Sequence, residues 1–254
     1  MTELYKKDTY FTTKDQFAFN QYCIEYDIKS AGLSICQEFK LLPDDVIEDL
    51  KTNYSKTDRV KKLGKMQIND NVLKKGLKDG FIEARRRFIE ANDIEDEDIV
   101  SIKKDAIFVS KVCNQLNFGH IKFVNKNQYT SFIRLPNRIE LFYFCGKIDV
   151  KGIGENVDKH KDFILKLLST FFKKMEMGDE DNVGKFMRKT IDAYKFRNLE
   201  LGYYREFNSQ STYTVIDEDN EITQYDEYWA DGIDDVLITY NWENVILPLL
   251  KIIY

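Results

Sequence analysis

Two short apolar runs that flank a charged triplet constrain the fold more than any other part of the chain. The runs cover residues 99–102 and 106–109, and Lys103, Lys104 and Asp105 lie between them. Short runs rich in β-branched and aromatic residues are typical of strands, and charged residues between two such runs are typical of a turn. We therefore expect a β-hairpin with Asp105 at its tip.

Four further segments are rich in β-branched and aromatic residues and favour strands. They are residues 17–27, 120–125, 128–135 and 138–150. Between and after them, apolar residues recur at helical spacing. The expected helices cover residues 30–41, 44–54, 71–92, 158–195 and 243–253. This mixture predicts an α+β fold, in which helices pack on an antiparallel sheet.

Two glycines, Gly152 and Gly154, separate a strand-rich part of the chain from a helix-rich part. We expect a domain boundary here, with one domain over residues 1–152 and another over residues 153–254. The chain has 254 residues, which is enough for one large domain or for two small domains with separate cores.

The charge balance limits the classes of partner. Lysine and arginine number 38, aspartate and glutamate number 43, and the net charge is −5. A module dedicated to duplex DNA is usually basic, so we do not expect tight, non-specific DNA binding. A locally positive cleft on an acidic protein is still compatible with nucleic acid.

Cysteine and histidine are used sparingly. The four cysteines lie far apart with no CxxC pair, which favours reduced thiols in the core of a cytoplasmic protein over zinc or disulfides. The two histidines are His120 and His160, and we expect His120 to be a loop or packing residue. No apolar run approaches the roughly 18 residues of a membrane span, so no membrane partner is expected. Chemistry would rest on carboxylates, lysine, arginine or tyrosine.

Two aspartates form the candidate site. Asp27 ends one expected strand, and Asp105 lies at the tip of the expected hairpin. Neighbouring strands of one sheet can bring such carboxylates together, where they repel each other unless a cation lies between them. Magnesium favours carboxylates plus substrate phosphates, and two Mg²⁺ ions would activate an attacking oxygen and stabilise a leaving one. The alternative is a pair of strand-end aspartates that face water.

Five segments, taken in order, carry a family resemblance. In YDIKSAGLSI, Asp27 and Ser30 match a D-x-x-S-L-Y-P-S-I pattern, and in VSIKKDAIFV, Asp105 matches the second aspartate of Y-G-D-T-D-S-I-F. The other three segments are KNQY at 126–129, KIDVKGI at 147–153 and YNWENVILPLLKI at 240–252. In this order they resemble the region from palm to thumb of family B DNA polymerases, over roughly residues 20–254.

The resemblance implies a polymerase-like palm, reduced fingers inserted at about residues 40–92, and a mostly helical thumb after residue 152. It also implies that Asp27 and Asp105 would hold two Mg²⁺ ions for nucleotidyl transfer. The substrates would then be a template–primer nucleic acid and nucleoside triphosphates.

The same resemblance assigns three nucleic-acid contacts. Lys126 and Tyr129 match the K-K-R-Y element that touches the primer strand near its end. Lys151 matches the lysine at the entry to the thumb, which implies a position near the DNA contact of that domain.

The chain departs from the family in its fingers. It has no room for a proofreading exonuclease, and the K-x-x-x-N-S-x-Y-G motif is missing between residues 40 and 92. Arg59, Lys62 and Lys65 are the best replacements for binding a triphosphate, and Arg59 and Lys62 are three residues apart on one helix face. A solvated basic face is the alternative.

Two more departures bear on activity and on the choice of sugar. Lys103 stands at the first aspartate of D-T-D, and a cation there would weaken metal binding. Gly32 aligns with the bulky aromatic that blocks a ribose 2′-OH. Ser30 and Gly32 would thus border a nucleotide site that accepts ribonucleotides. The alternative is that Gly32 only permits close backbone packing.

Three arginines in a row, Arg85, Arg86 and Arg87, lie in the helix expected over residues 71–92. Consecutive helical residues point in different directions, so at most two of them would face a cleft and track phosphate. The acidic run at 94–99 lacks the spacing and the glycine of an EF-hand, which predicts a solvated turn.

Our leading hypothesis is a minimal, exonuclease-free polymerase of phage or mobile-element type, with primase or RNA-synthesising activity included. It would act in the cytoplasm, that of the bacterial host if a phage encodes it. The alternative is a catalytically inactive palm-like subunit that binds a larger replication or transcription complex, which Lys103, the reduced fingers and the acidic charge favour. A third option is a template-independent nucleotidyltransferase.

Overall fold

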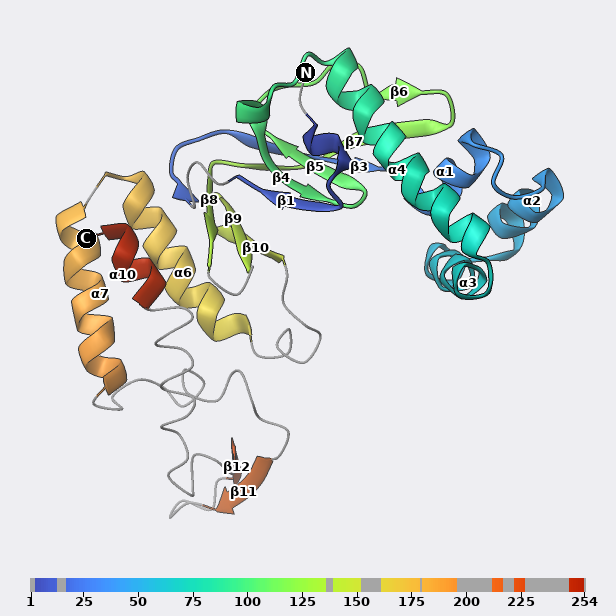
Figure 1. Ribbon diagram of the computed structural model, residues 1–254. Helices are drawn as coiled ribbons and strands as arrows, with labels where there is room; N and C mark the ends of the chain where they lie inside the picture. The colour runs from blue at the N-terminus through green and yellow to red at the C-terminus, as the bar shows by residue number, and fades with distance from the viewer. Residues whose placement is uncertain are drawn as a thin grey trace. The chain divides into compact units, whose positions relative to one another are not determined.

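The computed structural model describes residues 3–12, 17–135, 139–151, 161–178, 180–195, 212–216, 222–226 and 247–253 (Figure 1). The chain forms two compact units. The first comprises Met1–Asp15 and Gln21–Tyr129, and the second comprises Gln16–Asn20 and Thr130–Tyr254. Both units combine antiparallel sheets with helices, as the α+β prediction requires.

A six-stranded sheet in the order β1-β4-β5-β3-β7-β6 organises the first unit, and each neighbouring pair is antiparallel. Its strands are β1 (Thr9–Phe11), β3 (Cys23–Ile28), β4 (Ile99–Lys103), β5 (Ala106–Val109), β6 (Asn117–Phe118) and β7 (Ile121–Tyr129). The predicted hairpin is confirmed, because β4 and β5 pair directly and Lys104 and Asp105 form the turn between them.

Strand β3 lies between β5 and β7, and its two faces differ in character. Side chains alternate between the faces of a strand, so Ile24, Tyr26 and Ile28 point to one side and Glu25 and Asp27 to the other. The apolar set is at most 3% exposed and belongs to the main core of this unit. The acidic set is therefore on the face that does not pack into this core.

Two helices of the first unit begin at side-chain caps. The Ser55 hydroxyl accepts a hydrogen bond from the Asp58 backbone N–H, and the Asp70 carboxylate accepts from the Val72 and Leu73 N–H groups, which satisfies amides at helix starts. The helices are η1 (Leu4–Lys6), α1 (Ala31–Glu38), α2 (Asp44–Asn53), α3 (Lys56–Asn69), α4 (Asn71–Ala91) and η2 (Asp96–Asp98).

Helix α4 packs its apolar face into the core beneath the sheet. The buried residues of this face recur every three or four positions, as expected of one side of a helix: Leu73, Leu77, Phe81, Ala84 and Phe88. At its end, the Phe88 ring stacks on Phe123 of β7 with centroids 4.2 Å apart and lies 5.3 Å from the Tyr26 ring of β3. These rings pack α4 against β3, which carries the acidic face, and against its neighbour β7.

The second unit is built on a four-stranded antiparallel sheet in the order β10-β9-β8-β2. Its core includes Phe171 and Phe172, both fully buried, and Phe172 stacks on Tyr143 with centroids 5.0 Å apart. The elements of this unit are β2 (Phe17–Ala18), β8 (Ser131–Arg134), β9 (Glu140–Phe144), β10 (Lys147–Lys151), α6 (Lys161–Glu176), α7 (Glu180–Lys195), β11 (Thr212–Ile216), β12 (Ile222–Asp226) and α10 (Leu247–Ile253).

Two expected strands are each divided in the structure. Residues 17–27 form β2 and β3, which belong to different units, and the left-handed Asn20 (φ 54°) lies between them. Within the expected strand 138–150, the described residues form β9 and most of β10, a hairpin whose turn has positive φ at Cys145 and Gly146. Local composition favoured strand throughout both segments and did not reveal the reversals.

The expected domain boundary near Gly152 falls within residues 152–160, which lie outside the described residues. The two compact units divide in sequence between Tyr129 and Thr130. Strands β8, β9 and β10 belong to the second unit because they pair with one another and with β2. Among the described residues, no helix combines the length and apolar character needed to cross a membrane.

Replacing Phe88 with alanine tests the aromatic core of the first unit. The ring is fully buried between Tyr26 and Phe123, so Phe88→Ala should lower the unfolding free energy by about 3–5 kcal/mol. Hydrogen exchange of the β3 and β7 amides reports this unit separately from the other. Val72→Ala, at a side chain 82% exposed, is the control and should change the unfolding free energy by less than about 0.5 kcal/mol. A loss below about 1.5 kcal/mol for Phe88→Ala would contradict this packing.

Candidate functional site

A cavity of about 220 Å³ in the first unit brings acidic and basic side chains together. Asp27 of β3 and Asp105 of the β4–β5 turn line it, and Lys56, Arg59 and Lys104 line it as well. The remaining wall is formed by Ile28 of β3 and by residues at the start of α1, along α3 and on α4, which are apolar except for Ser30 and Gln67. The cavity therefore presents two carboxylates and three cations around one volume.

The pairing of β3 with β5 places the two carboxylates. Asp27 lies opposite Ala106, the residue after Asp105, and the Ile28 N–H donates to the Asp105 carbonyl over 3.1 Å. Burial raises the pKa of Asp105, and the nearby charge of Asp27 raises it further. Asp27 is thus close enough to disfavour the ionised form of Asp105.

Arg85 fixes the turn that carries Asp105. Its side chain is completely buried, and it donates from Nε to the Tyr5 carbonyl over 2.8 Å, from Nη1 to the Lys104 carbonyl, and from Nη2 to Asp8 over 3.2 Å. The Lys104 N–H in turn donates to the Asp8 carbonyl over 2.7 Å. A buried guanidinium needs such acceptors, and here they come from the N-terminal segment and from the turn.

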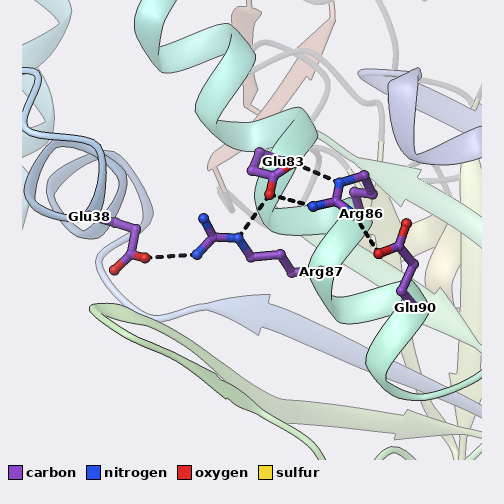
Figure 2. A network of polar contacts seen from close by, with 5 residues as sticks. All are labelled: Glu38, Glu83, Arg86, Arg87 and Glu90. Atoms are coloured by element: carbon purple, nitrogen blue, oxygen red, sulfur yellow. Dashed lines mark hydrogen bonds and ion pairs between the residues drawn. The ribbon is translucent and has the colours of Figure 1, made fainter.

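The two neighbouring arginines are held by carboxylates, as Figure 2 shows. Arg86 pairs with Glu83 at 2.7 Å and with Glu90. Arg87 bridges Glu83 and Glu38, at 2.9 and 2.7 Å. None of the three arginines lines the cavity, so the phosphate contact that we considered for one or two of them does not occur at this site.

Glu38 has a second role in the same network. Its carboxylate also accepts from the His120 backbone N–H over 2.7 Å, at the tight turn between β6 and β7. A side chain at Gly119, where φ is +66°, would collide with this carboxylate. His120 is therefore a turn residue whose described contact is made by its backbone, in line with its expected loop position.

Lys126 of β7 contacts the acidic face of β3 directly. Its Nζ lies 2.9 Å from Asp27 Oδ2 and 3.4 Å from Glu25 Oε1. Burial alone would lower the pKa of Lys126, but the hydrogen bond to Asp27 and the charges of both carboxylates outweigh it and raise the pKa. Sequence reasoning missed this pairing, because it depends on the register between two strands far apart in the chain.

Tyr129 is buried instead of facing a groove. It is 4% exposed, its ring stacks on Phe108, and its hydroxyl donates to Glu25 Oε2 over 2.9 Å. Asn127 donates to the same oxygen over 2.7 Å. In this position the Tyr129 side chain does not reach the surface, where the expected primer contact would be made. Its hydroxyl supports the Glu25 carboxylate behind Asp27 instead.

Helix α3 turns only part of its basic surface toward the cavity. Lys56 and Arg59 line it, and Leu63 follows on the same face. Lys62 points elsewhere, because its Nζ bonds Tyr54 Oη at 2.6 Å and Asp49 at 3.2 Å. The expected pair of Arg59 and Lys62 is thus replaced by Lys56 and Arg59, which are also three residues apart. The same spacing rule could have found Lys56.

Ser30 and Gly32 both line the cavity at the start of α1. Ser30 has a left-handed backbone, with φ 51°. A Cβ atom at Gly32 would lie 3.4 Å from the Leu63 Cδ1 atom, which is close to ordinary contact. Gly32 therefore leaves room for a methyl group, and the backbone packing there does not require glycine.

The cation that reaches the cavity from the hairpin tip is Lys104, and Lys103 is not among the lining residues. Lys103 pairs with Thr9 and Ala106 as the last residue of β4.

Lys151 lies in the second unit, where it is 27% exposed and 3.7 Å from Asp149. Within the described residues, no group of three His, Cys, Asp or Glu side chains is arranged to hold a metal. Asp27 and Asp105 are the carboxylates of the cavity.

Comparison with solved structures finds a likeness to the family B DNA polymerase from the hyperthermophilic archaeon Pyrobaculum calidifontis. The sequences are 11% identical and the TM-score is 0.43. The match covers 92% of this chain but only 44% of the polymerase, so the chain spans less than half the length of that protein. No curated protein matches the sequence. One family model, described as Bacteriophage PBS1 gene 130 protein, matches residues 1–254, and the chain belongs to that family.

Proposed function

We propose that the first unit catalyses nucleotidyl transfer, and that the chain is a template-directed nucleic acid polymerase. The observation that carries the proposal is the cavity in which Asp27 and Asp105 face Lys56, Arg59 and Lys104. Paired carboxylates suit divalent cations, and adjacent cations suit phosphates. One cavity that offers both is suited to a nucleoside triphosphate with its metal.

The residues present fit Mg²⁺. The charge of Asp27 helps to raise the pKa of Asp105, so a cation held by both carboxylates would relieve this repulsion. Two carboxylates without further protein ligands match the preference of Mg²⁺ for a few carboxylates plus substrate phosphates. When bound, Mg²⁺ would activate the attacking hydroxyl and neutralise charge that develops on the phosphate.

The other residues of the site would bind and orient the nucleotide. Lys56 and Arg59 extend from one face of α3, and we assign to them the β- and γ-phosphates. The primer 3′-oxygen would form a bond to the α-phosphorus while the bond from that phosphorus to the β-phosphate oxygen breaks. Pyrophosphate leaves with the electron pair of that bond. Fixed positioning of the two reactants would supply much of the rate enhancement.

We further propose that the site accepts ribonucleotides. Gly32 lines the cavity without a side chain, and the space beside it has room for a methyl group before Leu63 is reached. A sugar that carries a 2′-hydroxyl would meet no side chain at this position. Synthesis of RNA, including primers, would then be open to the enzyme.

In this proposal the sheet that carries Asp27 and Asp105 acts as the palm, and α2, α3 and α4 act as reduced fingers. The second unit would correspond in part to a thumb, and Lys151 would contribute a nucleic-acid contact there. Lys126 would come near the primer end after release from Asp27. A phage-encoded enzyme of this kind would work in the cytoplasm of the bacterial host.

A second candidate function is supported by the contacts of Lys126. Its ammonium bonds Asp27 and neutralises the charge that a metal would otherwise neutralise. A palm-like subunit that binds a replication or transcription complex without catalysis of its own would need no metal, because this ion pair already neutralises Asp27. Measurements on the two aspartates and on Lys126 separate the two functions.

Primer extension tests the leading proposal. With Mg²⁺ and a labelled primer–template, the wild-type chain should extend the primer with NTPs as well as dNTPs. Asp27→Asn and Asp105→Asn should each lower the rate at least ~100-fold, because each removes a carboxylate that would hold the metal. Asp79→Asn, at an exposed position on α4, is the matched control and should keep full activity. No extension by the folded wild-type chain would favour the non-catalytic subunit instead.

The repulsion between the carboxylates predicts a pH-dependent effect of Asp105→Asn. The pKa of Asp105 in the folded protein lies above its ordinary value of 3.8, so ionised Asp105 destabilises the fold at neutral pH. This cost disappears as the pH falls below the value of the unfolded chain. Asp105→Asn should raise the melting temperature in metal-free buffer by about 2 °C at pH 7.

The increase in melting temperature caused by Asp105→Asn should shrink toward zero near pH 3.5. The control variant Asp79→Asn should not show this pH dependence. Differential scanning fluorimetry without metal at both pH values makes the comparison. A melting temperature that falls at pH 7 in Asp105→Asn would show that the charge stabilises the fold, against the repulsion argued here.

The ion pair of Lys126 predicts a change in metal affinity. A cation that binds Asp27 must displace the Lys126 ammonium, and a half-exposed ion pair contributes roughly 0.5–1 kcal/mol. Lys126→Gln should therefore lower the Mg²⁺ concentration that half-saturates the thermal shift about two- to fivefold. Lys122→Gln, on the same strand, should leave it unchanged. An unchanged or higher concentration for Lys126→Gln would mean that Lys126 does not compete with the metal.

A further inference from the structure

A second hollow adjoins the cavity, and four of its nine lining residues are lysines. Its volume is about 390 Å³, and it shares Gln67, Leu77, Phe81 and Lys104 with the cavity of the two aspartates. The side that the cavity does not share carries three lysines of helix α4, namely Lys74, Lys75 and Lys78. We call this hollow the lysine groove.

The lysine groove carries an excess of positive charge that its own side chains do not balance. Its lining holds four lysines and one carboxylate, Asp8, and that carboxylate is paired with Arg85 at 3.2 Å. Lys74, Lys75 and Lys78 are exposed, and no carboxylate of the described residues forms an ion pair with them. On a chain with a net charge of −5, this cluster is a local concentration of positive charge.

The spacing of the lysines suits a chain of phosphates. Lys74 and Lys78 are four residues apart on α4, which corresponds to about 6 Å along the helix axis. This is comparable to the separation of neighbouring phosphates in an extended strand. Lys104 lies where the groove meets the cavity, with its Nζ 5.1 Å from the centre of the Phe81 ring. The positive charges therefore lead from α4 to the edge of the carboxylate site.

We infer that the lysine groove binds the phosphodiester backbone of single-stranded nucleic acid next to the cavity. The identity of the ligand as nucleic acid rests on the proposed function, whereas the anion-binding character rests on the groove itself. A hollow of this size is on the scale of a small ligand, which fits one or two nucleotides of a single strand and not a duplex. A strand held here would pass directly beside Asp27 and Asp105.

Salt-dependent binding of an oligonucleotide tests the inference without any catalytic step. Fluorescence anisotropy of a labelled deoxythymidine 12-mer would be measured between 50 and 200 mM NaCl, without metal or nucleotide. Each lysine that neutralises a phosphate contributes about 0.7 to the slope of log K against log salt for single strands. Because the groove holds one or two phosphates, the triple variant K74Q/K75Q/K78Q should lose about 0.7–1.4 from this slope and bind about tenfold more weakly at 50 mM NaCl.

A matched variant controls for the loss of three charges. K40Q/K51Q/K61Q removes three exposed lysines of the same unit that line neither the groove nor the cavity, and it should keep most of the slope. Equal weakening in both triple variants, or in neither, overturns the inference. So does a wild-type chain that does not bind the 12-mer. Loss of tripolyphosphate binding alone in K74Q/K75Q/K78Q would assign the groove to nucleotide entry and overturn it as well.

The outcome can be distinguished from that of the proposed function. Asp27→Asn removes a negative charge beside the strand and should bind the 12-mer at least as tightly as the wild-type chain, because Asp27 is not part of the groove. Lysine-dependent binding without any primer extension would remove the proposed catalysis and keep the groove. Primer extension that depends on both aspartates, with binding unaffected by K74Q/K75Q/K78Q, would do the reverse.

Discussion

The antiparallel pairing of β3 with β5 on one side and β7 on the other determines where the two carboxylates of the cavity and the Lys126 ammonium lie. The register with β5 places Asp27 opposite Ala106, the residue that follows Asp105. The register with β7 places the Lys126 side chain within hydrogen-bond distance of Asp27. On the opposite face of the same strand, Tyr26 lies in the aromatic core next to Phe88. A slip of one residue in β3 would exchange these two faces, so the core and the candidate site depend on the same hydrogen bonds.

The first unit resolves its buried charges in two different ways. Arg85 is fully buried and its desolvation lowers its pKa, but acceptors from Tyr5, Asp8 and Lys104 surround the guanidinium and oppose this cost. The pKa of Asp105 is raised by burial and by Asp27, which outweigh the opposing charges of Lys104 and Lys126. The unit thus surrounds the cation that supports the turn with acceptors and leaves the anion at its tip unfavourably placed. Such an imbalance is common where a protein binds a ligand of opposite charge.

The sequence was most informative where the signal is local. The hairpin around Asp105 follows from residues within a few positions of each other. The contact between Lys126 and Asp27 spans 99 residues and depends on strand register, which no local pattern contains. The burial of Tyr129 likewise depends on which face of the sheet its side chain points to, and this is set by the register of β7 with β3. The chemical roles assigned to the site residues stay predictions.

The short strand β2 has a consequence for the order in which the chain can fold. It lies early in the sequence, between segments of the first unit, yet it pairs with β8 of the second unit, and Phe19 beside it packs against Phe171 and Phe172. During synthesis, residues 17–19 leave the ribosome more than a hundred residues before these partners exist. A fragment that begins at Thr130 would expose the edge of β8 and lack an aromatic ring in its core. Although its chain forms two compact units, the protein cannot be divided into two independent genetic modules by a single cut.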